Sequence, residues 1–112
     1  MKSVGGKAIG WLQLKSGTAK NEIGEVVPQF TTLHTLTGWL DYSAGESNRT
    51  SYNAKIQEST HIFLCDYFQL DPRITAENSR MIVNGKKYDV LVIDNVMEMN
   101  QHFEIYLKYT GA

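Results

Sequence analysis

The sequence predicts a mainly β single domain of six or seven antiparallel strands with one long loop at residues 43–58. Apolar and polar residues alternate with the two-residue period of strands in several segments, whereas helical periodicity is weak throughout. Short turn-forming stretches separate these segments, as expected for hairpins and a meander. The length of 112 residues is that of one domain with a single, marginal core.

The first half of the chain is expected to hold two strands. Residues 10–16 (GWLQLKS) form the first and residues 29–42 (QFTTLHTLTGWLDY) the second. The polar, glycine-containing stretch SGTAKNEIGEVVP connects them and ends at Pro28. Gly38 indicates a bulge or bend in the second strand. Leu36, Leu40 and Tyr42 share one side of that strand, and Trp39 lies on the other.

The second half is expected to hold four more strands, at residues 59–69, 80–84, 86–95 and 102–110. A proline-containing loop, LDPRITAEN, follows the first of these. Asn84-Gly85 predicts a two-residue type I′ turn, because both residues tolerate a positive φ. Lys86 and Lys87 follow this tight turn. Their side chains are more simply interpreted as exposed to solvent than as a binding site for phosphate.

The last strand alternates cleanly and therefore has one buried and one mostly wet face. Strands 59–69 and 86–95 differ, because they carry apolar residues on both sides. One layer of sheet cannot hide both sides, so a helix, a long loop or another subunit must cover the second one. The sequence offers little helix, which favours subunit contact. The expected pairs of faces are Phe103, Ile105, Leu107 and Tyr109 against His102, Glu104, Tyr106 and Lys108; Tyr88, Val90 and Val92 against Leu91 and Ile93; and Phe63, Cys65 and Tyr67 against Ile62, Leu64 and Phe68.

The loop at 43–58 (SAGESNRTSYNAKIQE) is longer than most unstructured connections in compact domains. Its charges, Glu46, Arg49, Lys55 and Glu58, cancel. Tyr52, Ala54 and Ile56 alternate with polar residues, which suits a short polar strand if a partner edge is available. A simple excursion from the domain is the alternative.

Composition excludes several classes of protein. The formal net charge is −1, without the basic excess of a dedicated nucleic-acid binder. The single cysteine, Cys65, allows no internal disulfide and favours a reducing, intracellular origin. No apolar run is long enough to span a membrane, and the N-terminus has no signal core. Without such a signal, the glycosylation pattern at Asn48 is a chance match.

Catalytic and metal motifs are not found in the sequence. His34, His61 and His102 lie far apart, and one cysteine cannot build a cysteine-rich zinc site. Cys65 is expected to be a buried, inert residue. We therefore expect no enzyme activity, no cofactor and no metal. An oligonucleotide-binding barrel would stack bases on exposed rings, with Trp11, Trp39 and Tyr106 as candidates, but the basic side chains that such a protein needs are missing.

Five stretches together resemble a known family, in order and spacing rather than through one specific motif. The chain is similar, over roughly residues 20–110, to the head-closure or head–tail joining proteins of long-tailed bacteriophages, also known as head-completion or connector proteins. Phe30 stands where family members often carry Trp. The stretches are NEIGEVVPQF (21–30), GWLDYSAGES (38–47), ESTHIFLCDY (58–67), SRMIVNGKKYDVLVIDNV (79–96) and FEIYLKY (103–109).

The resemblance implies a small β-barrel that assembles as a homo-oligomeric ring of twelve copies in the virion neck. Such a ring lies below the portal and adaptor, closes the DNA exit channel after packaging, and docks a tail-completion or tail-terminator protein. The chain would occupy the host cytoplasm during assembly and contact packaged DNA only transiently.

Under this reading, residues 43–58 form a lumen-facing gating loop, and residues 1–10, which match nothing in the family, are a candidate flexible N-terminal arm. Two alternatives stay open. One is another ring protein of the phage neck, such as a tail-completion or tail-terminator protein, and the other is a monomeric oligonucleotide-binding barrel. The expected interaction residues of the loop are Ser47, Asn48, Arg49, Thr50, Ser51, Tyr52 and Lys55.

Overall fold

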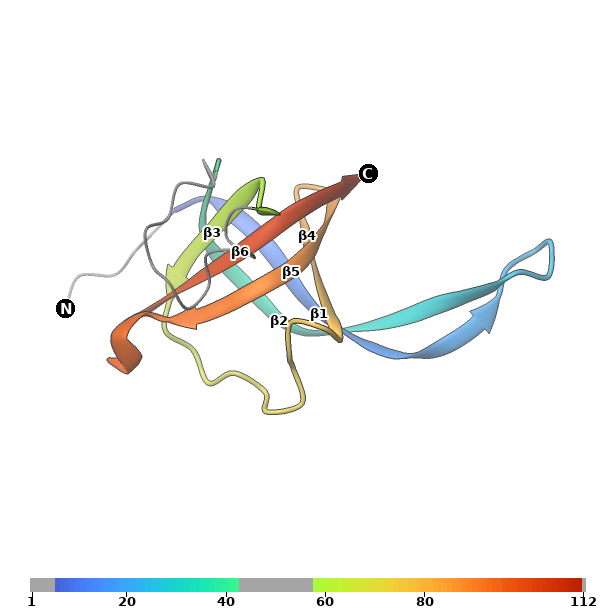
Figure 1. Ribbon diagram of the computed structural model, residues 1–112, viewed down its shortest axis with the longest axis horizontal. Helices are drawn as coiled ribbons and strands as arrows, with labels where there is room; N and C mark the ends of the chain where they lie inside the picture. Colours follow the sequence, from blue (N-terminus) through green and yellow to red (C-terminus); the bar gives the residue numbers. More distant parts are fainter. Residues whose placement is uncertain (1–5, 43–57, 112) are drawn as a thin grey trace.

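The computed structural model describes residues 6–42 and 58–111 and forms one closed antiparallel β-barrel (Figure 1). The strands follow each other around the barrel in the order β1-β2-β3-β6-β5-β4. This arrangement confirms the mainly β prediction. Six strands and one short 3-10 helix make up the described structure: β1 (Ala8–Lys20), β2 (Val26–Tyr42), β3 (His61–Asp66), β4 (Ser79–Val83), β5 (Lys86–Asn95), η1 (Val96–Glu98) and β6 (His102–Gly111).

The hairpin of β1 and β2 extends far beyond the barrel (Figure 1). The two strands pair from Ala8 opposite Gly38 to Lys20 opposite Val26, so only residues 21–25 form the turn. The expected strands at 10–16 and 29–42 were therefore too short. The projecting ribbon consists of β1 and β2 alone, and proline is tolerated in such edge strands, as Pro28 is here opposite Thr18. The molecule consequently measures 48 Å along its longest axis and 26 and 25 Å across.

The start of β1 also corrects the expectation of a flexible arm at residues 1–10. Residues 8–10 lie in the strand, and Gly6 packs so closely on the backbone of Gly38 that a Cβ there would overlap its carbonyl oxygen. Residues 1–5 lie outside the described part of the chain, as do residues 43–57 of the expected loop.

The core fills the barrel and draws on all six strands. The alternation predicted for the last strand is confirmed for Phe103, Ile105 and Leu107, which are buried, whereas Tyr109 is 43% exposed because it lies near the end of the barrel. Closure lets the inward face of each strand bury itself against the others. The fully buried side chains are Leu12, Phe63, Cys65, Met81, Val83, Ile105 and Leu107.

A bulge in β5 corrects the expected faces of that strand. Val90 pairs with Leu107 and Val92 with Tyr106, so Leu91 is an extra residue between two rungs. The parity of the strand changes there, and Val92 joins the outer side while Ile93 packs against the core. Tyr106, expected on a wet face, is only 9% exposed in the same outer group. Sequence alternation cannot reveal a bulge within a run of apolar residues.

Gly38 marks a close approach of two strands rather than the expected bulge. It pairs regularly with Ala8 on one side and Cys65 on the other, while the register shifts of β1 and β2 lie elsewhere. A Cβ on Gly38 would overlap the carbonyl oxygen of Leu64. Glycine is therefore required by the backbone of β3.

The turn between β4 and β5 is the one that Asn84-Gly85 predicts. Asn84 has a φ of 53° and Gly85 a φ of 78°, the positive values of a type I′ turn. Lys86 and Lys87 follow it with exposed side chains. The ends of β4, β5 and β6 differ from the expected strands by one residue at most. β3 is shorter than the expected 59–69, because the chain leaves the sheet after Asp66.

Replacing Ile105 with Ala should lower the free energy of unfolding by about 2–5 kcal/mol, because the side chain is fully buried and its removal leaves a cavity. Urea denaturation of both proteins measures the difference. Lys108→Ala on the exposed side of β6 is the matched control and should change stability by less than about 0.5 kcal/mol. Equal stability of the Ile105 variant and the parent would mean that β6 faces the other way.

Candidate functional site: the loop end of the barrel and the outer apolar surface

All seven expected interaction residues, Ser47 to Tyr52 and Lys55, lie outside the described part of the chain. The structure instead describes the barrel end at which β2 stops at Tyr42 and β3 starts at His61. We call this the loop end. It is where residues 43–57 leave and rejoin the barrel, so its chemistry bears on any role of that segment.

Aromatic rings cluster at the loop end. Ring centroids lie 5.0 Å apart for Tyr42 and His61, 5.0 Å for His61 and Tyr88, and 5.6 Å for Tyr88 and Tyr109. They come from four different strands, so the barrel itself brings them together. A hollow of about 270 Å³ lies beside them, lined by Leu40, Asp41, Tyr42, His61, Val83, Asn84, Lys86 and Tyr88.

The histidine of this cluster is held as a neutral ring. The backbone N–H of Tyr109 donates to the hydroxyl of Thr60 (2.8 Å), and that hydroxyl lies 2.8 Å from Nδ1 of His61. Burial and then the charge of Lys86 lower the pKa of His61. Burial, followed by the neighbouring Tyr109 and Tyr42, raises the pKa of Tyr88. The loop end therefore presents uncharged rings at neutral pH, which suit packing rather than acid–base chemistry.

The opposite end of the barrel contains a second constrained histidine. Nε2 of His34 accepts a hydrogen bond from the backbone N–H of Asp71 (3.0 Å), and its ring lies 4.7 Å from that of Phe68. Burial lowers the pKa of His34, partly offset by the charge of Asp71. Hydrogen bonds from Arg73 lower the pKa of Asp71 to about 2. These contacts anchor the loop between β3 and β4, which makes this histidine structural.

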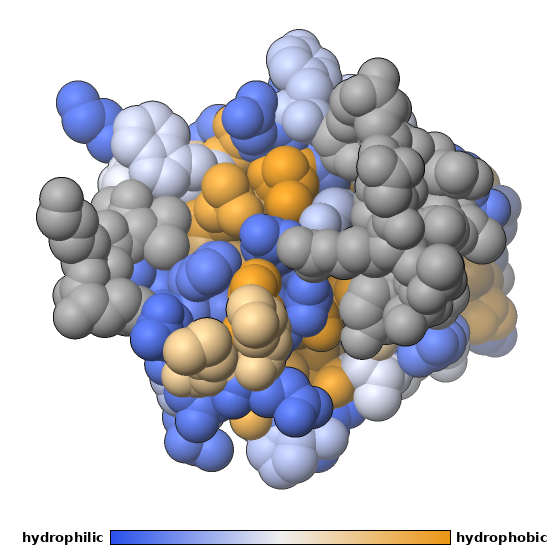
Figure 2. Space-filling view, turned by 60° about the vertical axis from the view of Figure 1, so that its left-hand side comes forward, coloured by the Kyte–Doolittle hydropathy of each residue, from blue (hydrophilic) through white to orange (hydrophobic). Residues whose placement is uncertain are grey.

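Apolar residues also gather on the outside of the barrel. Val92 and Tyr106 form a small cluster there with Ile62 and Leu91, which we call the outer cluster. Tyr106 donates from its hydroxyl to Glu104 (3.0 Å). Figure 2 shows one face of the molecule on which hydrophobic residues gather among hydrophilic ones.

The three aromatic residues considered for base stacking do not form one platform. Trp11 on β1 and Trp39 on β2 are 46% and 52% exposed, but Tyr106 is buried in the outer cluster. Trp11 pairs with Thr35, whereas Trp39 pairs with Leu64 on the other edge of β2. Bases of a single strand would find no continuous row of rings here.

A second apolar hollow lies on the outside, between β1 and β4. We call it the β1–β4 pocket; its volume is about 170 Å³. Trp11 and Ile82 pair directly across the two strands. Lys87 is the cross-strand partner of Ile82, so its exposed side chain lies on the same face of the sheet beside the pocket. The pocket is lined by Ile9, Trp11, Ile82, Asn84 and Gly85.

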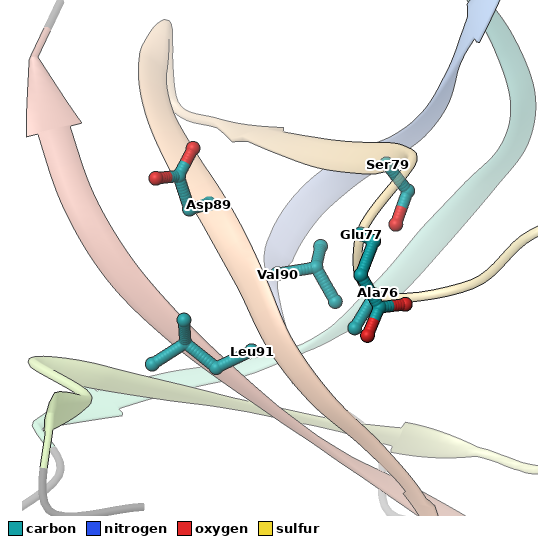
Figure 3. Close-up of a pocket in the computed structure, with 6 residues that line it drawn as sticks. All are labelled: Ala76, Glu77, Ser79, Asp89, Val90 and Leu91. Atoms are coloured by element: carbon teal, nitrogen blue, oxygen red, sulfur yellow. The ribbon is translucent and has the colours of Figure 1, made fainter. Parts of the chain in front are cut away.

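A third hollow, of about 320 Å³, lies where β4 and β5 separate (Figure 3). It contains two carboxylates, those of Glu77 and Asp89. They point in different directions in Figure 3. This arrangement does not form a general acid–base pair.

Other reactive groups of the described residues are also separated. Burial raises the pKa of the Cys65 thiol to about 12, so it is not a nucleophile at neutral pH. Within residues 6–42 and 58–111, no three His, Cys, Asp or Glu side chains converge as metal ligands. No helix in that part of the chain is long and apolar enough to cross a membrane.

Sequence reasoning missed two exposed features. One is the tip of the β1–β2 arm, where Ile23 is 79% exposed. The other is the turn after β5, where Met97, Glu98 and Asn100 all have positive φ values and Met97 is 81% exposed. Glycine and polar residues around Ile23 indicated a turn, but alternation gave no measure of how far the arm projects.

The comparisons with known proteins give no further guide. No protein-family model matches this chain, and no curated protein is detectably similar to it. The function has to be argued from the residues and their arrangement.

The free energy of unfolding should fall as the pH is lowered from 7.5 to 5.5. The folded-state pKa values of His34 and His61 lie below the ordinary value of 6.5, so the unfolded chain binds more protons in this range. Their contribution is present above pH 6.5 and is lost as the pH falls. Urea denaturation at each pH measures the free energy of unfolding. This free energy should change less steeply with pH in the double variant His34→Gln/His61→Gln than in the parent.

Phe30→Leu removes a ring that does not titrate and should keep the parent slope, which makes it a control for this measurement. Identical slopes for the parent and the double histidine variant would show that neither ring is held neutral by the fold.

Proposed function

We propose that this chain is a structural protein of the bacteriophage neck. It forms a ring below the portal and adaptor, closes the DNA exit channel after packaging, and presents a docking surface for the tail. The proposal joins the resemblance of residues 20–110 to head-closure proteins with the outward-facing apolar side chains of the barrel. The protein acts by assembly and carries out no reaction.

The observation that carries the proposal is the apolar surface on a barrel whose core is already complete. Seven residues in the interior are each at most 2% exposed. Trp11, Trp39 and Ile9 nevertheless remain about half exposed on the outside. Exposed aromatic and aliphatic residues on several sides of a small barrel are typical of surfaces that contact other subunits.

A gating role for residues 43–57 fits the two places where the described chain stops and resumes. Both ends of the segment join the same end of the barrel, after Tyr42 and before His61. A rigid cluster of neutral rings supports that end. In a ring, identical segments attached at one end of each barrel can meet at the axis. Residues such as Arg49 and Tyr52 would there meet DNA or a neighbouring segment.

Near-neutral charge also suits a channel through which DNA must later leave. The chain carries 11 basic and 12 acidic residues. Each phosphate contact adds salt-dependent affinity for DNA, so a chain without a basic excess holds the duplex weakly. Closure then depends on contacts between subunits rather than on gripping the nucleic acid.

Replacing residues 43–57 by a short Gly-Ser linker should leave the barrel folded and the ring able to assemble, but capsids carrying this form should lose DNA. The reason is that the strands and the β3–β4 loop supply the described core, while the proposed gate lies within the segment. Thermal unfolding tests the fold, electron microscopy with the portal complex tests the ring, and nuclease sensitivity of packaged DNA tests closure.

A Gly-Ser linker of the original length is the matched control that separates the length of the segment from its side chains. Normal DNA retention and tail joining by the short form would eliminate the gating role and make the segment a spacer. Absence of the protein from neck complexes would eliminate the proposed function itself.

Duplex DNA should bind the free protein only weakly at physiological salt, with a dissociation constant above about 10⁻⁵ M, because few phosphates can be neutralised. Fluorescence anisotropy with a labelled duplex measures this constant. Submicromolar binding would instead favour an oligonucleotide-binding barrel.

A further inference from the structure

The arm tip is built to present one apolar side chain. Oδ1 of Asn21 accepts hydrogen bonds from the backbone N–H groups of Ile23 (3.1 Å) and Glu25 (2.9 Å). The backbone of Asn21 also pairs with Gly24 and Glu25. Gly24 has a φ of +86°, which lets the chain reverse. This network fixes a five-residue turn, residues 21–25, at whose surface Ile23 stands 79% exposed.

The arm that carries this tip has no core of its own. An isolated two-stranded ribbon is at best marginally stable in water, and this one projects from the barrel with both faces uncovered by other strands (Figure 1). Val26, next to the turn, is 65% exposed. A ribbon that presents a fixed apolar tip is stabilised when that tip is buried against another surface.

The β1–β4 pocket offers a matching surface. Its walls are the side chains of Ile9, Trp11 and Ile82, and an apolar hollow of about 150 Å³ is large enough for a benzene-sized group. At about 170 Å³ it can receive one branched aliphatic side chain. Ile9 is 52% exposed and Trp11 is 46% exposed, so burial there removes substantial apolar area from water.

Charge is complementary between the two surfaces. The turn carries the exposed Glu22 and Glu25, with one exposed lysine, Lys20, directly before it, whereas the exposed Lys87 lies beside the pocket as the cross-strand partner of Ile82. Two carboxylates beside an apolar tip and a lysine beside an apolar pocket favour one relative orientation of the two surfaces.

The tip cannot reach the pocket of its own chain. Trp11 lies in the pocket and Lys20 at the far end of the same extended strand, nine residues later, which is about 30 Å. The arm points away from the barrel (Figure 1). The occupant of the pocket must therefore come from another molecule, and the complementary tip is carried by every copy of this chain.

We propose that the arm tip, residues 21–25, docks through Ile23 in the β1–β4 pocket of a second copy of this chain, with Glu22 facing Lys87. This proposal rests on the proposed ring and names the contact that links its neighbours. The contact is heterologous, because different surfaces of the two copies meet, and such contacts close into rings when the rotation between copies allows it.

Two complementary variants test the contact in the full-length protein. Ile23→Lys blocks the tip and Ile9→Glu blocks the pocket; both side chains are more than half exposed, so the barrel should remain folded. Sedimentation velocity at increasing concentration should show self-association of the parent and monomers for each variant alone. An equimolar mixture should form dimers and nothing larger, because only one tip and one pocket remain active in each pair.

Matched controls separate the contact from general loss of apolar surface. Ile23→Leu keeps an aliphatic tip and should associate like the parent. Met97→Asp removes an exposed apolar side chain away from both surfaces and should also do so. Glu22→Lys and Lys87→Glu should each weaken association at least several-fold, and the double variant should recover most of it.

A monomeric parent at every concentration, unchanged association of the blocked variants, or a mixture without dimers would each overturn the proposed contact. Those results leave the neck function intact if the protein still enters neck complexes with the portal. Conversely, dimers in the mixture together with absence from neck complexes would support the contact and overturn the neck function.

Discussion

The pairing of β1 with two neighbours determines most of this structure. Over Gly10–Leu14, β1 pairs with β4 and so closes the barrel, while along its whole length it pairs with β2. Closure gives every strand of the barrel two partners and leaves no free edge there. The part of β1 that extends past β4 has only β2 as a partner, so the same strand that seals the core also becomes the projecting arm.

Closure also decides where assembly contacts can form. Without a free edge in the barrel wall, another chain can contact the described barrel only through outward side chains, the arm, or the loops at its ends. Trp11 and Ile82 face outward from the very rungs that close the barrel. The outer apolar surface is therefore held by a rigid wall, which keeps its shape when a partner binds and limits the entropy lost on contact.

A feature could be predicted from the sequence when it depends on residues that are close together in the chain. Local signals identified the alternation of Phe103, Ile105 and Leu107 and the turn at Asn84-Gly85, because period and turn chemistry depend on neighbouring residues. The bulge at Leu91 depends on how β5 meets β6, and the run of four apolar residues at 90–93 hides it. The cluster of Tyr42, His61 and Tyr88 unites distant strands. The point at which the arm leaves the barrel is set by Ser79, where β4 begins opposite Leu14.

The strength of the contact between copies has a consequence for how a ring would form. One isoleucine in a shallow pocket and one exposed ion pair give a weak single contact, since an exposed ion pair contributes about 0–1 kcal/mol. In a closed ring each copy uses its tip and its pocket at once, and closing the last contact occurs within one assembly at high effective concentration. Open chains of copies are then short-lived, and the closed ring is the stable species. Weak individual contacts also allow errors to dissociate before closure, whereas the barrel of each copy, held by its buried core, stays intact throughout.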